Sequence, residues 1–421
     1  MPVTFLDRRA VRPAVNARRR RRPLALGLAA LALLATSSSA VASEALSVGL
    51  APAARVTPTA VAPLPASFSF SGRGWGHGVG MSQWGARGRA EAGQTAAQIL
   101  VHYFPGTTLG SVNAGTQVRV LVYAATPPTS TAPLRVVGRG GTWAIDGLAK
   151  SFPADAVLRA WQTTVTSSSG TTVKRWALQV KSTTGSVLYS GKRAPDIRVR
   201  PTASATQLQL DSKPTTYDTY RGVLRLVLTG RVTVVNELPL DLYLRGVVPI
   251  EMPPSWPTAA LRAQAIAARG YAFRRLHPTT GLYDLYDDSR SQVYRGVRGE
   301  SSVANAAIAA TAGRVVKSGS AVANTMFHST GGGATENNEN VFVSSTGRVV
   351  AAPVSYLRGS LDRDASGHPY DRGSPHYAWH TATYTPVQLG TILGHDSRTS
   401  VGALKALDLS ARGVSGRLIR V

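Results

Sequence analysis

Gly246-Val-Val-Pro-Ile-Glu-Met-Pro-Pro-Ser-Trp-Pro257 is followed by an alanine-rich segment that runs from Thr258 to Leu276. The last proline suits the first turn of a helix. Small and apolar residues then recur at helical spacing, at Leu261, Ala265, Ala268 and Ala272. Small side chains let a helix approach a sheet closely, so the segment predicts a buried central helix.

Glu251 is the single carboxylate of the quoted stretch, and Met252, Pro253, Pro254 and Trp256 follow it closely. Apolar neighbours remove hydration, which disfavours the charged form and raises the pKa toward the range useful to a proton donor. General acid catalysis is one hypothesis. The residues alone leave a second hypothesis open, in which Glu251 is exposed beside a proline-rich turn or lies near a helix N-terminus.

The stretch 246–257, together with Ala260-Leu-Arg-Ala-Gln-Ala-Ile-Ala-Ala-Arg-Gly-Tyr-Ala272, resembles the signature of the SpoIID/LytB family. Two later blocks resemble further family blocks in the expected order, Tyr286-Asp-Asp-Ser-Arg-Ser-Gln-Val-Tyr-Arg-Gly296 and Met326-Phe-His-Ser-Thr-Gly-Gly-Gly333. The resemblance covers residues 207–380. It implies either a lytic transglycosylase that acts on bacterial peptidoglycan or a wall-binding enhancer of an N-acetylmuramoyl-L-alanine amidase.

The expected fold class is α+β, with mainly antiparallel strands and the alanine-rich helix lining a SpoIID-like substrate groove. Short segments separated by Gly, Pro, Ser and Thr clusters predict the strands, at 118–123, 176–180, 207–210 and 224–230. A second helix is predicted over 301–312, between a capping Ser301 and Gly313. A strand over 321–327 is expected to lead into the turn formed by Gly331 to Gly333.

Several polar residues in these blocks are predicted to bind substrate: Arg269, Gln292, Tyr294, His328, Ser329 and Thr330. The resemblance implies that Arg269 helps to shape the active groove. However, Arg269 lies about 18 Å along the helix from Pro257, at 1.5 Å per residue, so it reaches Glu251 only if the Glu251 loop folds back. A structural salt bridge of Arg269 is the alternative. Two hypotheses stay open for His328: it takes part in proton transfer as a second group, or it belongs to a polar turn that has no binding partner.

A glycine-rich block, residues 68–86, contains six glycines among nineteen residues. Glycine lets the backbone approach another surface closely, but no Lys-Ser/Thr ending follows that would indicate a nucleotide site. A glycine-rich hairpin corner is the other interpretation. The segments 74–86 and 97–107 resemble a family block that usually lies near the C-terminus. A circular rearrangement would let them complete the same domain, with His77, Ser82 and Gln83 beside the groove of Glu251.

The N-terminus predicts export, because five arginines at 18–22 precede an apolar run at 24–35 and a small-residue cleavage pattern at 40–42. An uncleaved anchor is the alternative. Predicted divisions of the chain are a signal peptide (1–42), an Ala/Pro-rich linker (43–67), a permuted glycine-rich part of the SpoIID domain (68–110), a β-rich accessory region (111–206) and the SpoIID/LytB core (207–421). We therefore expect a secreted or wall-associated protein.

Composition limits the possible chemistry and partners. The absence of cysteine excludes disulfides, thiolate ligands and cysteine nucleophiles. No Gly-x-Ser-x-Gly elbow is present, and Pro375 argues against a helical His376-x-x-x-His380 metal site, so no metal or cofactor is predicted. Without residues 1–42, 39 basic and 21 acidic residues remain. This charge favours anionic wall polymers rather than nucleic acid, for which no motif is present, or merely confers solubility.

The family resemblance implies a mechanism that needs one carboxyl group. Glu251 would protonate the oxygen between N-acetylmuramic acid and N-acetylglucosamine, and the 6-hydroxyl of the muramic acid would attack the anomeric carbon. The substrate supplies a tethered nucleophile, which spares the enzyme a second acid. Because Asp287, Asp288 and Glu336 lie near the motifs, hydrolysis remains open. Expected partners are therefore peptidoglycan glycan strands, with a cell-wall amidase as the partner in the enhancer hypothesis.

Overall fold

The computed structural model describes residues 64–277, 279–344 and 348–421, which all belong to one compact unit. The predicted signal peptide and nearly all of the predicted linker lie outside the described residues. Within the described ranges, no helix combines the length and the apolar character that crossing a bilayer requires.

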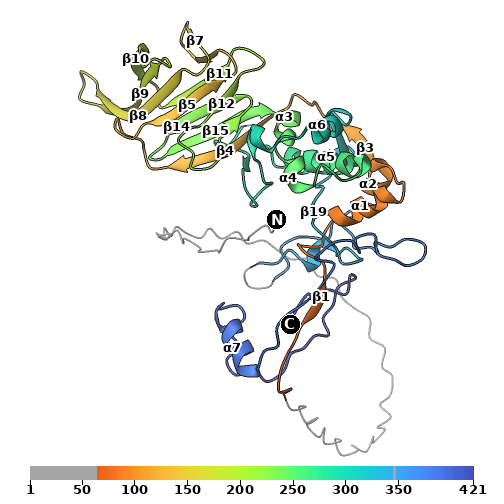
Figure 1. Cartoon of the computed structure of the whole chain (residues 1–421). Helices are drawn as coiled ribbons and strands as arrows, with labels where there is room; N and C mark the ends of the chain where they lie inside the picture. Colours follow the sequence, from red (N-terminus) through yellow and green to blue (C-terminus); the bar gives the residue numbers. More distant parts are fainter. Residues whose placement is uncertain (1–63, 278, 345–347) are drawn as a thin grey trace, which may run out of the picture. The chain divides into compact units, whose positions relative to one another are not determined.

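Two large, mainly antiparallel sheets are built from residues 117–239 and 285–286 (Figure 1). One has, in order, β16 (Leu285–Tyr286), β4 (Gln117–Ala125), β15 (Val232–Pro239), β14 (Val223–Leu228), β11 (Asp196–Pro201), β6 (Trp143–Ile145) and β7 (Ser151–Phe152), and only β16 pairs in parallel. The other has β10 (Val187–Arg193), β9 (Thr172–Lys181), β8 (Val157–Thr166), β5 (Leu134–Arg139), β12 (Gln207–Gln209) and β13 (Thr219–Tyr220).

The two sheets share one apolar core, because the strands alternate between buried and more exposed positions. In β4, Val118, Val120 and Val122 are buried while their neighbours are not. The fully buried indole of Trp176 in β9 donates a hydrogen bond to the Leu226 carbonyl oxygen of β14, at 3.3 Å, and so joins the two sheets. The predicted strand segments and the antiparallel α+β class are confirmed.

The boundary predicted at residue 206 passes through both sheets. Strand β11, before the boundary, pairs with β14 after it, and β5 pairs with β12 in the same way. Strand β4 also lies between β15 and β16. Because every one of these pairings joins the predicted accessory region to the predicted core, residues 111–206 are structurally part of that core rather than an appendage to it.

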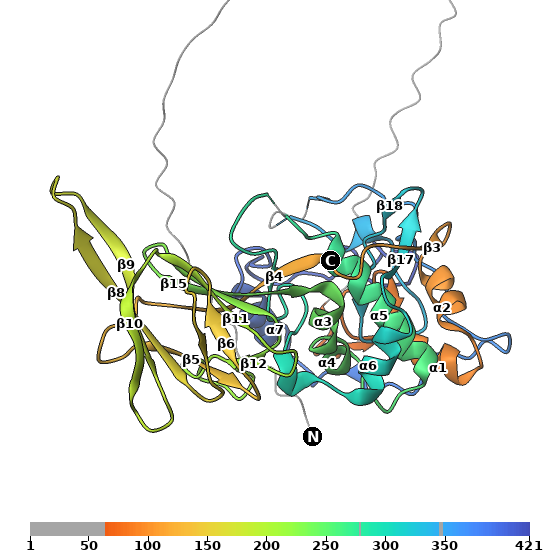
Figure 2. The ribbon, with the colours of Figure 1, turned by 90° about the horizontal axis from the view of Figure 1, so that it is seen from above.

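Helix α5 (Thr258–Phe273) is the predicted alanine-rich helix, and it is buried on two sides. Ala265, Ala268 and Ala272 belong to the core shared with the sheets. Ala263 and Ala267 belong to a second core, formed with residues of the glycine-rich N-terminal block. Figures 1 and 2 agree that α1 (Gln83–Glu91) and α2 (Ala96–Tyr103) lie on the side of α5 that faces away from the large sheets. Alanine leaves room for neighbours on both sides, which explains the composition of the helix.

Three further helices and several short strands complete the surroundings of α5. The helices are α3 (Leu240–Arg245), α4 (Val248–Glu251) and α6 (Ser302–Ala309), with 3-10 turns at Gly296–Gly299 and Asn338–Asn340. Helix α6 follows Ser301 as predicted, although the Ser301 side chain forms no capping hydrogen bond. Strand β17 (Arg314–Ser318) lies between β3 (Thr108–Ser111) and β18 (Ala321–Val322).

The continuous strand predicted over 321–327 is wrong. Strand β18 ends at Val322, and β19 comprises only Phe327 and His328. Between them the hydroxyl of Thr325 donates a hydrogen bond of 2.6 Å to the Ala267 carbonyl oxygen of α5. This buried contact turns the chain toward the helix and interrupts the strand.

The glycine-rich block forms no hairpin. Strand β1 (Ser71–Arg73) pairs with β20 (Ala378–His380), whereas β2 (Met81–Ser82) pairs in parallel with β19. Between β1 and β2, every second residue from Gly74 to Gly80 has a positive φ, between 70° and 101°. Only glycine adopts that conformation at no steric cost, so the alternating glycines are needed for the path of this segment. After β20, the chain forms α7 (Pro386–Gly394).

Candidate functional site

Glu251 is the last residue of α4, a single turn that begins just after Val247. Its backbone N–H donates to the Val247 carbonyl oxygen at 3.0 Å. The next residue, Met252, is fully buried and packs with Leu261 of α5 and Ala307 of α6. Met252 therefore fixes the end of α4 to two helices, and Glu251 remains partly exposed.

The carboxyl group of Glu251 lies in a largely apolar environment. Burial raises its pKa above the usual value for a glutamate, although hydrogen bonds from the Val293 backbone and from Gln83 oppose the shift. The Val293 N–H lies 3.2 Å from Oε1. No ion pair of Glu251 occurs among the described residues. This carboxyl group can therefore hold a proton at a higher pH than an exposed glutamate.

Gln83 links the glycine-rich block to this carboxylate. Its side-chain amide donates a hydrogen bond of 2.9 Å to the backbone carbonyl oxygen of Glu251, although the two residues lie 168 positions apart. Two tyrosines, Tyr243 and Tyr271, are also close enough for the charge of Glu251 to add to the burial that raises the pKa of each hydroxyl. The sequence analysis singled out neither tyrosine. The position of Tyr271 within the signature block is the one signal that could have identified it.

Arg269 does not reach Glu251. Its guanidinium group is fully buried and lies 2.6 Å from Asp241 of α3, with a further hydrogen bond of 2.9 Å to the Arg314 carbonyl oxygen. Burial lowers the pKa of Arg269, whereas the contact with Asp241 opposes that change. The arginine therefore joins α5 to α3 and β17, as in the structural salt bridge that the sequence left open.

Gln292 and Tyr294 are buried, with 1% and 2% exposure. The Tyr294 hydroxyl donates to the Asn236 side chain of β15 at 2.8 Å. The Gln292 amide lies 3.3 Å from the Tyr243 hydroxyl and 3.4 Å from the Ala268 carbonyl oxygen. Both side chains are therefore packed inside the protein and leave no surface for a substrate.

His77 and His328 form a neighbouring pair, with ring centroids 5.4 Å apart. Burial lowers the pKa of His77 to about 4, and burial together with the charges of His77 and Arg417 lowers that of His328 well below its usual value. Nδ1 of His77 accepts from the Val79 N–H at 3.0 Å. Nε2 of His328 is buried and has no hydrogen-bond partner among the described residues. Both rings are therefore neutral near pH 7.

The remaining predicted residues support the backbone. The Ser82 hydroxyl caps α1 by accepting from the Gly85 N–H at 3.1 Å, and it also accepts from the Gly331 N–H. The Thr330 hydroxyl is buried and donates to Asp371 at 2.6 Å. Ser329 is partly exposed, and its carbonyl oxygen accepts from the Trp84 N–H at 3.0 Å. These contacts hold the two glycine-containing segments against each other.

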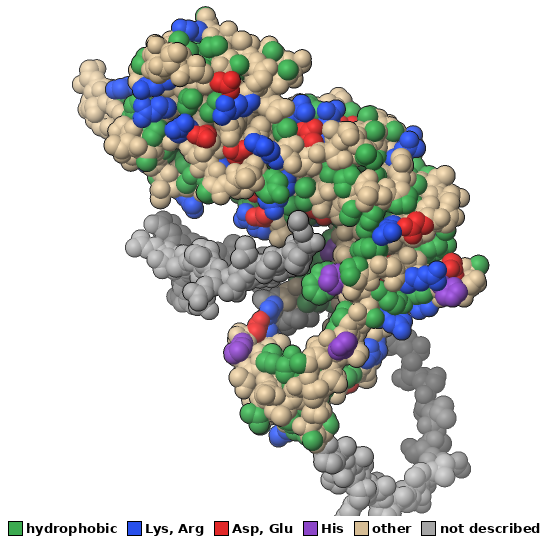
Figure 3. All heavy atoms as spheres, viewed as in Figure 1, with side chains coloured by type: hydrophobic (Ala, Val, Ile, Leu, Met, Phe, Trp, Pro, Cys, Tyr) green, Lys and Arg blue, Asp and Glu red, His purple; other side chains and the backbone are tan. Residues whose placement is uncertain are grey.

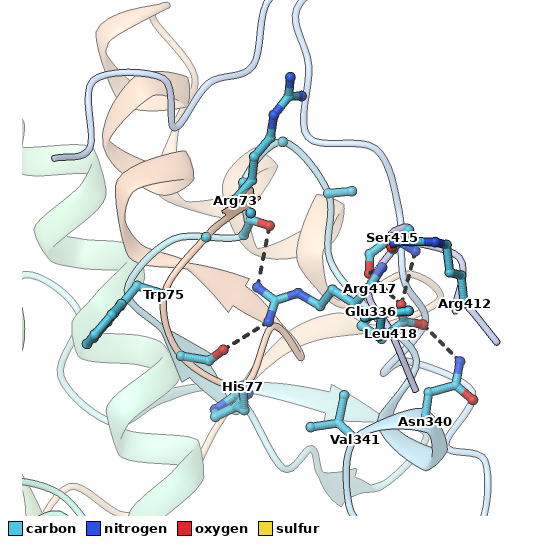
Figure 4. Close-up of a pocket in the computed structure, with 18 of the residues that line it drawn as sticks. Arg73, Trp75, His77, Glu336, Asn340, Val341, Arg412, Ser415, Arg417 and Leu418 are labelled. Carbon is cyan, nitrogen blue, oxygen red and sulfur yellow. Dashed lines mark hydrogen bonds between the residues drawn. The ribbon is translucent and has the colours of Figure 1, made fainter. Parts of the chain in front are cut away.

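A cavity of about 860 Å³ is lined in part by these two glycine-containing segments (Figure 4). His77 lines it, but Glu251 does not. The sequence analysis named Glu336 in this lining but missed the arginines, notably Arg417, whose guanidinium donates to the Gly76 carbonyl oxygen at 3.0 Å. No local pattern marks this arginine, because the contact joins residues 341 positions apart. Within the described chain, no group of three or more His, Asp or Glu residues is arranged to hold a metal ion.

Comparison with known proteins identifies the central part of the chain. The sequence profile of the SpoIID family, described as Stage II sporulation protein, matches residues 229–317. Residues 229–317 belong to the SpoIID family. This SpoIID segment contains Glu251, Arg269, Gln292 and Tyr294, whereas the glycine-rich block and the residues from His328 onward lie outside the matched range. The family assignment drawn from the signature is thereby confirmed.

Three relatives illustrate the extent of the similarity. Stage II sporulation protein D of Bacillus subtilis is 29% identical over 188 residues, which cover 40% of this chain and 50% of that protein. The amidase enhancer of Bacillus subtilis is 36% identical over 108 residues, or 26% of this chain and 14% of that protein. An uncharacterised protein of Brachyspira hyodysenteriae is 34% identical over 125 residues, which cover 29% of this chain and 34% of that protein. The chain thus spans half or less of each relative, and no solved structure matches it significantly.

Proposed function

We propose that this chain is an exported protein that cleaves the glycan strands of peptidoglycan as a lytic transglycosylase, with Glu251 as the general acid and base. The observation that carries the proposal is the environment of Glu251: burial raises its pKa, no described basic residue forms an ion pair with it, and it keeps partial access to solvent. Asp362 also has a pKa raised by burial, but it is fully buried and bound to Arg89 and Tyr103. Glu251 is therefore better suited to exchange a proton with a substrate.

The proposed reaction uses one carboxyl group twice. Glu251 donates its proton to the bridging oxygen between N-acetylmuramic acid and N-acetylglucosamine as that bond breaks. The 6-hydroxyl group of the muramic acid then attacks its own anomeric carbon and returns a proton to Glu251, which leaves a 1,6-anhydro end. General acid–base assistance of this kind typically contributes about 10²–10⁴-fold to the rate.

The other acidic residues named from the sequence form ion pairs or hydrogen bonds within the protein. Asp287 lies 2.7 Å from Lys213, and Asp288 lies 2.8 Å from Arg290. Glu336 accepts hydrogen bonds from the Val414 and Ser415 backbone. A hydrolytic mechanism needs a second carboxylate at about 5–10 Å from the first. Because these three have other partners, the single-acid mechanism is favoured.

Aromatic side chains beside Glu251 suit the binding of sugar rings. Trp84, next to Gln83, packs edge-on against Trp256 with ring centroids 4.7 Å apart, and Arg87 lies over both rings. Both indoles are partly exposed. Flat aromatic faces can cover the apolar faces of pyranose rings, so this group offers a place for the sugars that flank the bond to be cleaved.

The test uses purified sacculi and mass analysis of the soluble products. We expect the wild-type protein to release muropeptides with 1,6-anhydro ends, and the Glu251→Gln variant to lose about 10²–10⁴-fold of that activity because the amide cannot donate the proton. Asp155→Asn, an exposed carboxylate that pairs with Arg139, is the control and should retain full activity. Equal product release by wild type and Glu251→Gln would reject the proposal, and reducing ends in place of anhydro ends would indicate hydrolysis. Export is tested separately by N-terminal sequencing of protein recovered from the wall, which should lack residues 1–42.

A second function is favoured by the relative named amidase enhancer, which is 36% identical over 108 residues. In that case the chain binds peptidoglycan and stimulates a separate N-acetylmuramoyl-L-alanine amidase. The distinguishing measurement is the release of stem peptides by a purified wall amidase, with and without this protein. Stimulation that is equal for wild type and Glu251→Gln, without anhydro products, would support the enhancer and exclude the transglycosylase.

A further inference from the structure

The cavity of about 860 Å³ gathers basic side chains that have no acidic partner. Four arginines line it, Arg73, Arg363, Arg412 and Arg417, and none of them forms an ion pair with an acid in the described part of the chain. Elsewhere basic residues are spread over the surface, as Figure 3 shows for one face. The cavity is therefore a local concentration of positive charge.

Glu336 is the one carboxylate among the residues that line this cavity, and its charge acts on Arg417 without forming an ion pair with any of the four arginines in the described part of the chain. Its oxygens accept hydrogen bonds from the backbone of Asn337 and Val414, from the Asn340 side chain, and from the N–H and hydroxyl of Ser415. Burial opposes its ionisation, but these hydrogen bonds hold the pKa of Glu336 below its usual value. Glu336 thus fixes the C-terminal turn at the cavity wall (Figure 4).

Two of the arginines occupy equivalent positions in tight turns. Nη1 of Arg363 donates to the Gly367 carbonyl oxygen at 2.9 Å, and Nη1 of Arg412 donates to the Gly416 carbonyl oxygen at 2.7 Å. Each uses only part of its five N–H donors in this way. Arg417 lies between the Gly76 and Gly331 carbonyl oxygens, and its Nε is buried without a hydrogen-bond partner among the described residues. Several guanidinium donors therefore remain for an anion.

Two tryptophans give the same cavity apolar surfaces. Trp75 is 45% exposed and stacks on His376, with ring centroids 4.8 Å apart. Trp379 is 40% exposed, and its indole N–H donates to the Gly74 carbonyl oxygen at 3.1 Å. Residue Gly72 lies directly under the Trp379 ring, since an added Cβ would come within 2.3 Å of it. The backbone thus fixes the Trp379 ring at the cavity wall.

We propose that this cavity is a second binding site, which takes a sugar unit that carries an acidic group. Guanidinium groups recognise carboxylates and phosphates by charge-assisted hydrogen bonds, and the tryptophans cover the sugar ring. Glu251 does not line the cavity, so the site requires no bond cleavage and goes beyond the proposed catalytic function. It would hold an anionic glycan on the protein whether or not Glu251 acts on it.

The experiment is a ligand titration followed by ¹⁹F NMR of protein labelled with 5-fluorotryptophan. Variants Trp75→Phe and Trp379→Phe assign the two resonances. N-acetylmuramic acid carries a carboxylate, whereas N-acetylglucosamine is a neutral sugar of the same ring type. We expect N-acetylmuramic acid to shift both resonances and to bind at least about tenfold more tightly than N-acetylglucosamine, with an affinity that falls as salt is raised.

A double variant, Arg363→Gln with Arg412→Gln, should weaken the binding of N-acetylmuramic acid at least about tenfold and leave that of N-acetylglucosamine unchanged. Arg398→Gln, an exposed arginine outside the cavity, is the matched control. Tighter binding of glycerol 3-phosphate than of N-acetylmuramic acid would support the anion site and identify a phosphate-bearing polymer as its source. Equal binding of the acidic and neutral sugars, or no effect of the double variant, would overturn the proposal. Glu251→Gln should bind all ligands like the wild type, which separates this result from any failure of the catalytic proposal.

Discussion

Replacing Asp241 by asparagine should lower the free energy of unfolding by about 3 kcal/mol, because Arg269 would keep its charge in the core without the carboxylate. Removing one partner of a buried ion pair typically costs about 3–5 kcal/mol. The lower end applies here, since the Asp241 side chain is 19% exposed and Arg269 keeps the Arg314 carbonyl oxygen at 2.9 Å. The two hydrogen bonds of 3.5 Å to α5 and α6 carbonyl oxygens are too long to compensate.

Urea unfolding, followed by far-UV circular dichroism, measures this loss. The double variant Asp241→Asn with Arg269→Met removes both members of the pair, so its loss should be smaller than the sum of the two single losses, by about 2 kcal/mol. Arg290→Gln is the control, because its ion pair with Asp288 is exposed and such pairs contribute less than about 1 kcal/mol. A loss below about 0.5 kcal/mol for Asp241→Asn, or strictly additive single losses, would refute the assignment of Arg269 as a buried structural clamp.

Three further predictions concern the region around Glu251 and the glycine-rich block. Because folding raises the pKa of Glu251, ionisation of this group opposes folding. Glu251→Gln should therefore match the wild type in urea stability at about pH 4 and exceed it at about pH 8. Equal stabilities of the two proteins at both pH values would be inconsistent with a buried acid. Gln83→Ala should cost about 1 kcal/mol in the same assay, since it removes the 2.9 Å hydrogen bond to the Glu251 carbonyl oxygen, and should also reduce muropeptide release from sacculi; unchanged values for both would exclude a positioning role. Gly76→Ala should lower the melting temperature more than Gly185→Ala, because both residues have positive φ but only at residue 76 would the new Cβ meet a neighbour, at 3.1 Å from the His328 Cβ; equal shifts would show that the contact is relieved without cost.

Local patterns predicted those parts of the fold that local physics determines. Alanine spacing after Pro257 identified α5. The helix ends at Phe273 rather than Leu276, because the Arg275 and Leu276 N–H groups bond back only three residues, to the Ala272 and Phe273 carbonyl oxygens. Alternating residues identified β4 and β14, since one face of each strand packs on the core. The raised pKa of Glu251 likewise followed from its immediate apolar neighbours.

Contacts between distant segments decided the rest. Tyr294 was predicted to bind substrate, but it is buried, and its hydroxyl donates a hydrogen bond to the Asn236 side chain 58 residues earlier. The boundary at residue 206 failed for a similar reason, since strand pairing depends on which edges meet and not on local composition. The arginine-lined cavity was invisible in the sequence, because it forms only where residues near 73, 363 and 412 come together.

The core between α5 and the glycine-rich block determines whether separate fragments of the chain can fold. Residues such as Ile99 and Leu100 are fully buried only when Ile266 and Ala267, far downstream in the sequence, pack against them. A chain cut in the exposed turn at Ser130 would therefore yield two pieces that each lack part of their own interior. Such pieces should recover their structure only on mixing, which makes the protein suited to fragment complementation.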